Sequence, residues 1–242
     1  MEISVIIPSL NEAAHIEAAI SSAKGAYEVI VVDAGSGDGT SDIARRSGAR
    51  VINALPGRGG QMDAGAASAS GGVLLFLHAD ALLPRTWLSS VRAALEDGVV
   101  GGAFRLSIRP GRPSLRLIEL AAGVRARLFG IVYGDQALFV RKDAFMRIGG
   151  FRKLPLMEDV DCVKRLKACG SFRLLKDRVT VSSRRWDAHG AFKTTFRNIV
   201  ILSMYLAGWP CARLYAVYHG GGARPRSGVL FEGGEGKGNP PS

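Results

Sequence analysis

Short apolar runs and helix-like segments alternate along the first hundred residues. The apolar runs cover residues 3–7, 29–32 and 73–77, and each has the length of a single strand; residues 50–53 (Arg-Val-Ile-Asn) predict a further short strand. Continuous apolar strands that alternate with helices are typical of an α/β fold with a parallel sheet covered on both faces. Because crossovers between parallel strands are right-handed, we expect the first strand between the second and the fourth, at a topological switch point.

The connecting segments carry helix and turn signals. Asn11 is a candidate N-cap for a helix that ends near Gly25, and Thr40 begins a second short helix. Residues 57–60 (Gly-Arg-Gly-Gly) predict a flexible loop, and a helix of small residues is expected over 61–70.

The pattern changes after residue 98. Phe104, Leu106 and Ile108 alternate with polar residues, which predicts a half-buried antiparallel strand. A Pro-Gly-Arg-Pro break follows, and then an amphipathic helix is expected, with its apolar stripe at Leu117, Leu120, Val124 and Leu128. Residues 137–140 and 172–175 predict further strands.

A late segment raises the question of membrane contact. Residues 199–212 carry no charge and are flanked by Arg197 and Arg213. These 14 residues are fewer than the roughly 20 that a helix needs to cross a bilayer. A core helix, an interfacial helix with Trp209 among lipid headgroups, and a membrane span all stay open. Residues 219–242 are rich in Gly and Pro, and a disordered tail is expected there.

Composition narrows the classes of partner. With 242 residues, of which 47% are hydrophobic, the chain is able to bury a substantial core. The net charge of +11 calls for an anionic partner, such as nucleotide-sugar phosphates or acidic lipid headgroups. No nucleic-acid recognition signature accompanies the charge, so we expect no nucleic-acid partner. Three cysteines without a disulfide framework, and a strand that begins at Ile3 with no signal peptide before it, predict a cytoplasmic protein.

Acidic residues follow two of the predicted strands. Asp33 comes directly after the second strand, and Asp80 follows the fourth within His78-Ala79-Asp80. The carboxyl ends of parallel strands form one edge of the sheet, where ligands bind. Asp80 is therefore a candidate ligand for Mg²⁺ or Mn²⁺, which would neutralise a diphosphate, although it is also suited to cap a helix. Asp33 is suited to accept hydrogen bonds from a base or ribose, or to form a turn before Gly35.

Further candidates lie in the second half of the chain and in the Gly-rich loop. Glu158 and Asp159 begin a predicted helix, where the helix dipole favours carboxylates. Asp159 is the candidate general base for an acceptor hydroxyl, with Asp161 as a rival. Arg184-Arg185-Trp186 combines guanidinium groups for a diphosphate with an aromatic platform for a sugar, or forms a solvated basic turn. Arg58 is suited to approach phosphates from the loop.

Jointly, these motifs resemble those of family 2 glycosyltransferases with the GT-A fold. The matching segments run in chain order over about residues 3–190: Val5-Ile6-Ile7-Pro8-Ser9-Leu10-Asn11-Glu12, Val31-Val32-Asp33-Ala34-Gly35-Ser36-Gly37-Asp38-Gly39-Thr40, Gly57-Arg58-Gly59-Gly60-Gln61-Met62, Phe76-Leu77-His78-Ala79-Asp80, Gly134-Asp135-Gln136, Met157-Glu158-Asp159-Val160-Asp161 and Ser183-Arg184-Arg185-Trp186. In detail the chain is most similar to a small bacterial subfamily found beside selenoprotein or radical-SAM domains.

The resemblance implies transfer of a sugar, with inversion, from a nucleotide-diphosphate sugar to an acceptor hydroxyl. Asp159 would be the base, with Glu158 beside it in the catalytic site, and Asp80 would hold a divalent cation, Mg²⁺ or Mn²⁺. The donor would be bound by Pro8, Asn11, Glu12, Asp33, Arg58, Gln61, His78, Asp80, Asp135, Arg184, Arg185 and Trp186. His78 departs from the family pattern, because it replaces the first carboxylate of the usual aspartate-x-aspartate motif.

The resemblance also implies a single GT-A domain over residues 1–218, with a mostly parallel central sheet flanked by helices. Residues 1–97 would bind the nucleotide, residues 98–190 would bind the acceptor and carry out catalysis, and residues 191–218 would form C-terminal helices that are candidates for contact with the inner membrane surface. The acceptor is unknown, and a lipid-linked one is a candidate. Two alternatives stay open. A nucleotidyltransferase of the same fold would need a Gly-rich basic loop after the first strand, which the chain lacks. The other is a non-catalytic nucleotide-sugar-binding scaffold.

Overall fold

The structure, a computed structural model, describes residues 1–96 and 98–219, apart from the side chains of Arg185, His189 and His219. The strands are β1 (Ile3–Ser9), β2 (Glu28–Asp33), β3 (Arg50–Asn53), β4 (Val73–Phe76), β5 (Ala81–Leu82), β6 (Val99–Arg109), β7 (Leu138–Arg141) and β8 (Ser171–Ser182). The helices are α1 (Ile16–Ser22), α2 (Thr40–Arg46), α3 (Arg58–Ser68), α4 (Trp87–Ala94), α5 (Pro113–Val124), η1 (Arg125–Phe129), η2 (Gly134–Gln136), α6 (Lys142–Arg147), α7 (Glu158–Lys167), α8 (Arg184–His189), α9 (Ala191–Leu206) and α10 (Cys211–His219). The expected tail over 220–242 lies outside the described residues.

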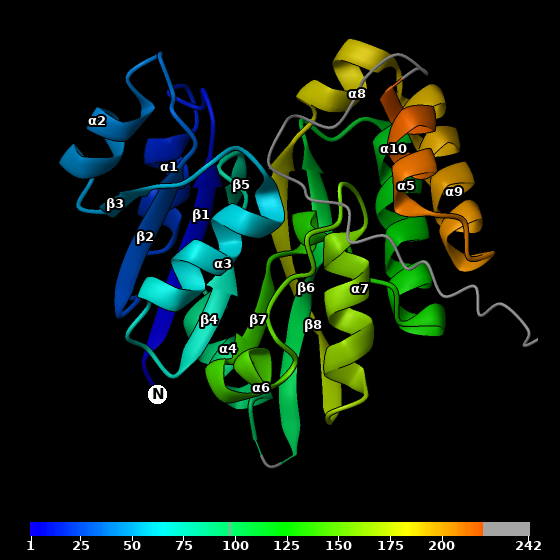
Figure 1. Ribbon diagram of the computed structural model, residues 1–242. Coiled ribbons are helices and arrows are strands. Elements are labelled where there is room, and N and C mark those ends of the chain that lie inside the picture. Colours follow the sequence, from blue (N-terminus) through cyan, green and yellow to red (C-terminus); the bar gives the residue numbers. More distant parts are fainter. Residues whose placement is uncertain (97, 220–242) are drawn as a thin grey trace, which may run out of the picture.

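All eight strands join one sheet in the order β3-β2-β1-β4-β7-β6-β8-β5. β1 pairs in parallel with β2 and with β4, which confirms the predicted switch point. The register places Ser9 of β1 beside Asp33 of β2. Neighbouring residues of each strand enter different cores, Val31 in one and Val32 in the other, because helices cover both faces of the sheet (Figure 1). The predicted α/β architecture is therefore confirmed.

The second half of the chain extends the same sheet. β7 is antiparallel to β4, and β6 is antiparallel to β7 but parallel to β8. The expectation of a half-buried antiparallel strand at Phe104, Leu106 and Ile108 is wrong in two respects. Leu106 and Ile108 pair in parallel with β8, and the antiparallel pairing with β7 is at Gly101 and Gly102. Ala103 and Ser107, on the opposite side of β6, are buried as well, because the strand lies between helices on both faces.

Two local predictions near the sheet edge are wrong. Asn11 does not cap α1, whose N-cap is His15, because its side chain accepts a hydrogen bond from the backbone N–H of Gly37. The residues after Gly57 do not form a flexible loop but the first turn of α3. Gly57 itself has φ 145, a backbone conformation that favours glycine, and it turns the chain into the helix.

Helix α5 turns the opposite side to the core from the one predicted. Leu117 and Leu120 are 64% and 65% exposed, whereas Glu119 is only 6% exposed. The Glu119 carboxylate accepts hydrogen bonds from the Ile108 backbone N–H and forms ion pairs with arginines, among them Arg178. The same side of α5 carries Leu115 and Ala122, which are buried in the core, and a buried carboxylate that is fully bonded is tolerated beside them. These apolar contacts and the Glu119 network together hold this side of the helix inward and leave the Leu117 stripe outside.

The uncharged segment over 199–212 is divided between α9 and α10, which are separated by a turn at Gly208. Ile201 and Leu214 are buried against Met157 and Val160, so one side of these helices belongs to the core, as the core-helix interpretation predicted. No helix among the described residues has both the length and the apolar character needed to cross a membrane. The three cysteines are free, in agreement with the sequence.

Candidate functional site

The carboxyl ends of β1 and β2 hold a network centred on Asp33. This carboxylate is 2% exposed and accepts hydrogen bonds from Ser9 Oγ at 2.9 Å, Ser36 N at 2.8 Å and Ser36 Oγ at 2.5 Å. Burial opposes ionisation of Asp33, but the hydrogen bonds from Ser36 and Ser9 outweigh it and lower its pKa. Asp33 therefore stays ionised and fixes the loop that follows β2.

The loop after β1 is bonded to the loop after β2. The backbone N–H groups of Asn11, Glu12 and Ala13 donate to side-chain oxygens of Ser36, Thr40 and Asp38 at 2.9, 2.9 and 3.0 Å. Asn11 adopts φ 55, a left-handed conformation that turns the chain toward this loop. Pro8, one residue before the end of β1, is half-buried beside Val32. These contacts form a rigid rim at the switch point.

Gln61 ties α3 to this rim. Its side-chain amide donates to the carbonyl oxygens of Ser9 at 3.0 Å and Val32 at 2.9 Å, where the two strands end. Gln61 is buried, whereas Arg58 at the start of the same helix is exposed. Gln61 thus braces the sheet edge in the structure, and Arg58 presents its guanidinium to solvent close to Glu158, with which it interacts electrostatically.

Arg184 joins two carboxylates across this edge. Its Nε lies 3.2 Å from Asp80 Oδ2, and an NH2 group donates to Glu12 Oε1 at 2.5 Å. The other oxygen of Glu12, Oε2, is buried and has no hydrogen-bond partner in the described part of the chain. The two carboxylates come from β1 and β4 loops, and Arg184 comes from the start of α8, so the fold brings together residues 172 positions apart.

The donor set here fits one kind of metal site. Among residues 1–96 and 98–219 no group of three or more His, Cys, Asp or Glu side chains converges as a metal cage. Mg²⁺ and Mn²⁺ bind instead through one or two carboxylates, with the remaining positions filled by water and substrate phosphates. Asp80, with Glu12 and its unsatisfied buried oxygen nearby, provides carboxylates of that number, so the residues fit a cation that arrives with a diphosphate.

Asp159 lies against Gly134 and His78. Asp159 Oδ2 accepts a hydrogen bond from Gly134 N at 2.5 Å, and Oδ1 accepts one from Val160 N at 2.7 Å. A Cβ atom on Gly134 would be 3.1 Å from His78 Nε2 and 3.3 Å from Asp159 Oδ2. Both side chains therefore approach the same point, and the absence of a side chain at Gly134 allows it.

Glu158, the neighbour of Asp159, is buried. Burial, together with the charge of Asp159, raises the pKa of Glu158 to about 7, although Arg58 opposes the shift. Its carboxyl group therefore changes protonation near neutral pH. Asp159 is half-buried by comparison, at the N-terminus of the same helix.

Asp161, the rival base, is committed to a structural network. Its two oxygens pair with Arg165 at 2.7 Å and with Arg152 at 3.3 Å. Arg165 also donates to the carbonyl oxygens of Ile148 and Gly150. Both oxygens of Asp161 are ion-paired with arginines, whereas those of Asp159 accept from backbone N–H groups, so the geometry favours Asp159 over Asp161 as the group that accepts a proton.

The Arg184-Arg185-Trp186 motif is only partly open. Trp186 is 8% exposed and packs in the core, with its Nε1 unsatisfied among the described residues, so it does not present an open aromatic platform. The side chain of Arg185 lies outside the described part. Asp135, within η2, is half-buried next to Gly134 and so lies near Asp159.

Contacts of Arg125 that no sequence motif indicates support the η2 turn that contains Gly134. Arg125 stacks on Tyr133 with its guanidinium carbon 3.6 Å from the ring centroid, and it donates to Gln136 Oε1 at 3.1 Å. Gln136 is fully buried and donates to Phe104 O at 3.0 Å. Arg125 belongs to no motif, and only its contacts reveal that it helps to hold the η2 turn.

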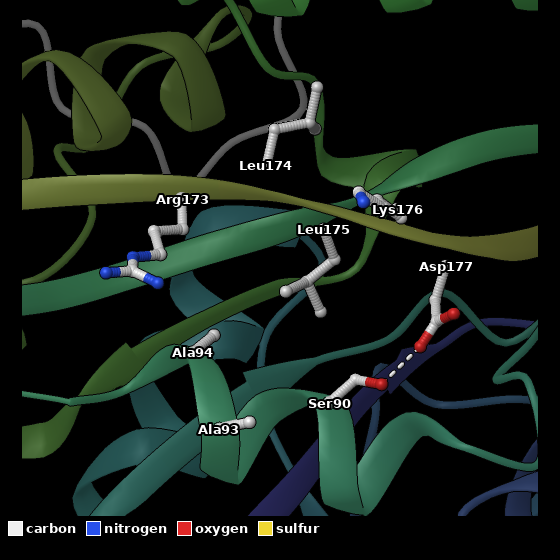
Figure 2. A pocket seen from close by; sticks show the side chains of 8 residues that line it. All are labelled: Ser90, Ala93, Ala94, Arg173, Leu174, Leu175, Lys176 and Asp177. Atoms are coloured by element: carbon white, nitrogen blue, oxygen red, sulfur yellow. Dashed lines mark hydrogen bonds between the residues drawn. The ribbon is translucent and has the colours of Figure 1, made fainter.

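Two hollows border the sheet. One of about 190 Å³ has Asp80, Arg109 and Ser182 in its wall, so it adjoins the candidate site. The other, of about 340 Å³, lies between α4 and β8, where Ser90 bonds to Asp177 (Figure 2). None of the predicted site residues lines this larger hollow, which therefore lies apart from the site.

Comparison with known proteins adds a family match and a fold match. The family model described as Glycosyl transferase family 2 matches residues 4–152. The crystal structure of glucosyl-3-phosphoglycerate synthase from Mycobacterium tuberculosis with Mn²⁺, uridine-diphosphate-glucose and phosphoglyceric acid is similar, with a TM-score of 0.60 and 22% identity over 86% of this chain and 80% of that chain. At this identity the likeness establishes the fold, which is the GT-A fold expected from the sequence.

Two curated relatives match parts of the chain. An uncharacterised glycosyltransferase from Mycobacterium tuberculosis is 31% identical over 97 residues, which cover 40% of this chain and 44% of the relative. Glycosyltransferase AglE from Haloferax volcanii is 35% identical over 171 residues, covering 62% of this chain and 55% of the relative. The chain thus spans about half the length of these relatives.

Proposed function

The chain belongs to glycosyl transferase family 2, and we propose that it transfers a sugar from a nucleoside-diphosphate sugar to an acceptor hydroxyl, with inversion at the anomeric carbon. The observation that carries the proposal is the position of the Asp159 carboxylate, which lies beside Gly134 and His78. His78 belongs to the His-Ala-Asp segment that also supplies Asp80. An inverting transfer needs a carboxylate close to the diphosphate site, because the acceptor proton must leave as the new bond forms.

On the acceptor side, Asp159 takes the proton. Its two oxygens are oriented by the N–H groups of Gly134 and Val160, and each retains further acceptor capacity. The acceptor oxygen attacks the anomeric carbon, its proton passes to Asp159, and the bond between the anomeric carbon and the diphosphate oxygen breaks. The nucleoside diphosphate leaves with that electron pair, and attack from the opposite side inverts the anomeric centre.

On the donor side, the nucleoside is assigned to the rim formed by Pro8, Asn11 and Asp33, and the diphosphate to Arg184 and Arg58. When bound at Asp80, a divalent cation, Mg²⁺ or Mn²⁺, neutralises the charge that develops on the leaving diphosphate. The Mycobacterium synthase was crystallised with Mn²⁺ and uridine-diphosphate-glucose, which supports a nucleoside-diphosphate sugar as donor and a divalent cation beside it. The guanidinium of Arg184, already held between Asp80 and Glu12, adds a positive charge at the same place.

The test first measures binding of the donor nucleotide and then measures transfer by a variant of the proposed base. Calorimetry with UDP, GDP, CDP and dTDP, each with and without Mn²⁺, identifies the nucleotide, and release of that diphosphate from its sugar conjugates, with a panel of acceptors, measures transfer. Asp159→Asn should bind the nucleotide within a few-fold of the wild type and lose transfer by about 100-fold or more. Asp143→Asn, which removes an exposed carboxylate on α6, is the matched control. A fully active Asp159→Asn variant would exclude Asp159 as the base.

The nucleotidyltransferase alternative is not favoured. That reaction needs backbone amides after β1 for a triphosphate. Here the N–H groups of Asn11, Glu12 and Ala13 already donate to side chains of the next loop. A non-catalytic scaffold would leave the oriented carboxylate of Asp159 without a task, and the substitution above distinguishes that alternative.

The proposal extends to the place of action, the acceptor and the remaining donor contacts. A cytoplasmic site of action and a lipid-linked acceptor fit the basic charge of the chain. Three further points stay predictions. They are membership of the bacterial subfamily found beside selenoprotein or radical-SAM domains, the division into halves at residue 97, and contacts with the donor by Gln61, His78, Asp135, Arg185 and Trp186. Alanine substitution at the donor residues, with calorimetry of the identified diphosphate, tests the contacts one at a time.

A further inference from the structure

Two neighbouring helices at one end of the molecule expose large apolar side chains. Figure 1 shows α5, α9 and α10 side by side at the end of the sheet remote from β3, and α9 contacts both α5 and α10. Phe192 and Phe196 of α9 are 83% and 70% exposed, and Leu117 and Leu120 of α5 are exposed to a similar degree. We call the exposed stripes of α5, η1 and α9 the outer helical face; its main members are Leu117, Leu120, Leu128, Phe192, Phe196 and Ile199.

These residues form stripes and are not scattered. Leu117, Leu120, Val124 and Leu128 recur at helical spacing, as do Phe192, Phe196 and Ile199, so each set lies on one side of its helix. The inward side of α5 carries Leu115 and Ala122 in the core, together with Glu119, which is held by hydrogen bonds and ion pairs. The exposed stripe is therefore a second apolar side of this helix, and exposed apolar residues grouped in this way mark a contact site.

The charge around the outer helical face has a single sign. Over residues 113–129 and 191–218 the chain has six basic residues and one acidic residue, Glu119, which is buried. Arg127 and Lys193 are exposed beside the stripes. Arg197 and Arg213 stack on Tyr218 and Trp209, at 4.3 and 5.8 Å from the ring centroids. Apolar stripes with a basic border and interleaved aromatic rings are the features of helices that lie in an anionic lipid interface.

We propose that the outer helical face docks the protein on the surface of a membrane that contains anionic lipid, with α5 and α9 lying in the interface. A second copy of the chain is a poorer occupant, because it would bring two basic borders together without acidic residues between them. No helix among the described residues spans a bilayer, which agrees with docking on the surface. The inference goes beyond the proposed reaction and does not depend on it.

Docking would place the site close to the lipid. Ile201 of α9 and Leu214 of α10 pack against Met157 and Val160, which flank Asp159. The helices that carry the outer helical face therefore also support the start of α7. An acceptor held in the membrane would reach the carboxylate from the adjacent side.

Vesicle co-sedimentation of the full chain tests the proposal. Wild-type protein should bind vesicles of phosphatidylcholine mixed with phosphatidylglycerol, bind pure phosphatidylcholine weakly, and lose affinity as salt rises. Phe192→Ser with Phe196→Ser should weaken binding by about tenfold or more, because less apolar area would leave water. Leu117→Ser with Leu120→Ser should do the same from the neighbouring helix. Met146→Ser, 56% exposed on α6, is the matched control and should bind as the wild type does.

A charge pair separates the two contributions. Arg127→Gln with Lys193→Gln should reduce binding several-fold to anionic vesicles and leave binding to neutral vesicles unchanged. Circular dichroism and nucleotide binding confirm that each variant is folded. The proposal is overturned if the wild type ignores anionic vesicles, or if both apolar double variants bind them as the wild type does. It is also overturned if sedimentation velocity shows a dimer that Phe192→Ser with Phe196→Ser dissociates, since a second copy would then cover the face.

Discussion

The buried carboxyl group of Glu158 makes the stability of the protein depend on pH. Burial raises its pKa from 4.5 to about 7 in the folded chain, and only 8% of the residue is exposed, so solvent screens it little. The folded state holds this proton more tightly than the unfolded state does. Stability from this group is therefore fully present below pH 4.5 and lost as the pH rises through about 7. At about 1.4 kcal/mol per pKa unit, the full loss is about 3 kcal/mol.

Glu158→Gln removes the titration and keeps the shape of the side chain. The free energy of unfolding, measured by urea titration from pH 5 to pH 8, should be similar for the two proteins at pH 5. By pH 8 the variant should be more stable by up to about 3 kcal/mol. Comparing the two proteins cancels the groups that they share. Asp143→Asn, an exposed carboxylate on α6, should give a curve parallel to the wild type. If the difference in free energy of unfolding between Glu158→Gln and wild type stays constant from pH 5 to pH 8, the Glu158 carboxyl group does not titrate in this range.

Three further substitutions test the site. Asp80→Asn should weaken Mn²⁺-dependent binding of the nucleoside diphosphate by about tenfold or more, measured by calorimetry, and an unchanged response to Mn²⁺ would show that other ligands hold the ion. Arg184→Gln should weaken nucleotide binding without metal by about tenfold, because one charge-assisted contact is lost; tighter binding of Mn²⁺ with unchanged nucleotide affinity would mean that the guanidinium only competes with the cation. Gly134→Ala introduces a Cβ atom 3.1 Å from His78 Nε2, and it should lower kcat/KM by about 10- to 100-fold. The free energy of unfolding should change by less than about 2 kcal/mol. If the alanine variant has the kcat/KM of the wild type, His78 and Asp159 move aside for the methyl group without a loss of activity.

The central sheet and the acidic edge could be predicted from local sequence. Strands β1, β2 and β4 each correspond to an apolar run, and parallel pairing with right-handed crossovers leaves few orders for the first four strands. The two-residue strand β5 has no such run and was not predicted. That order brings the carboxyl ends of β1 and β2 to one edge, where the register of the structure places Ser9 beside Asp33. The positions of Asp33 and Asp80 at strand ends are visible in the chain, since the end of an apolar run is a local property.

Side-chain commitments over long sequence distances could not be predicted. Asn11 carries a helix-capping signal, but the loop after β2 offers it a hydrogen bond from Gly37, 26 residues away. Gln61 has a motif position that suggests ligand contact, yet its amide is held by the carbonyl oxygens of Ser9 and Val32. Arg184 meets Glu12 only because α8 returns to the switch point. Such contacts depend on which strand ends become neighbours.

Helix α5 shows most clearly which features follow from local sequence and which depend on tertiary contacts. Its period of apolar positions determined that it would be an amphipathic helix, and the structure agrees that it is one. The side that faces the core carries Leu115 and Ala122, which are buried, and Glu119, whose carboxylate accepts a hydrogen bond from the Ile108 backbone N–H and pairs with Arg178 of the sheet. Periodicity along a helix fixes the sides relative to each other, but only tertiary hydrogen bonds and ion pairs set the free energy of burying one side rather than the other. The first four strands and the acidic edge thus follow from local sequence, whereas contacts between distant residues bring Arg184 to Asp80 and Asp159 to Gly134, and leave the Leu117 stripe of α5 exposed.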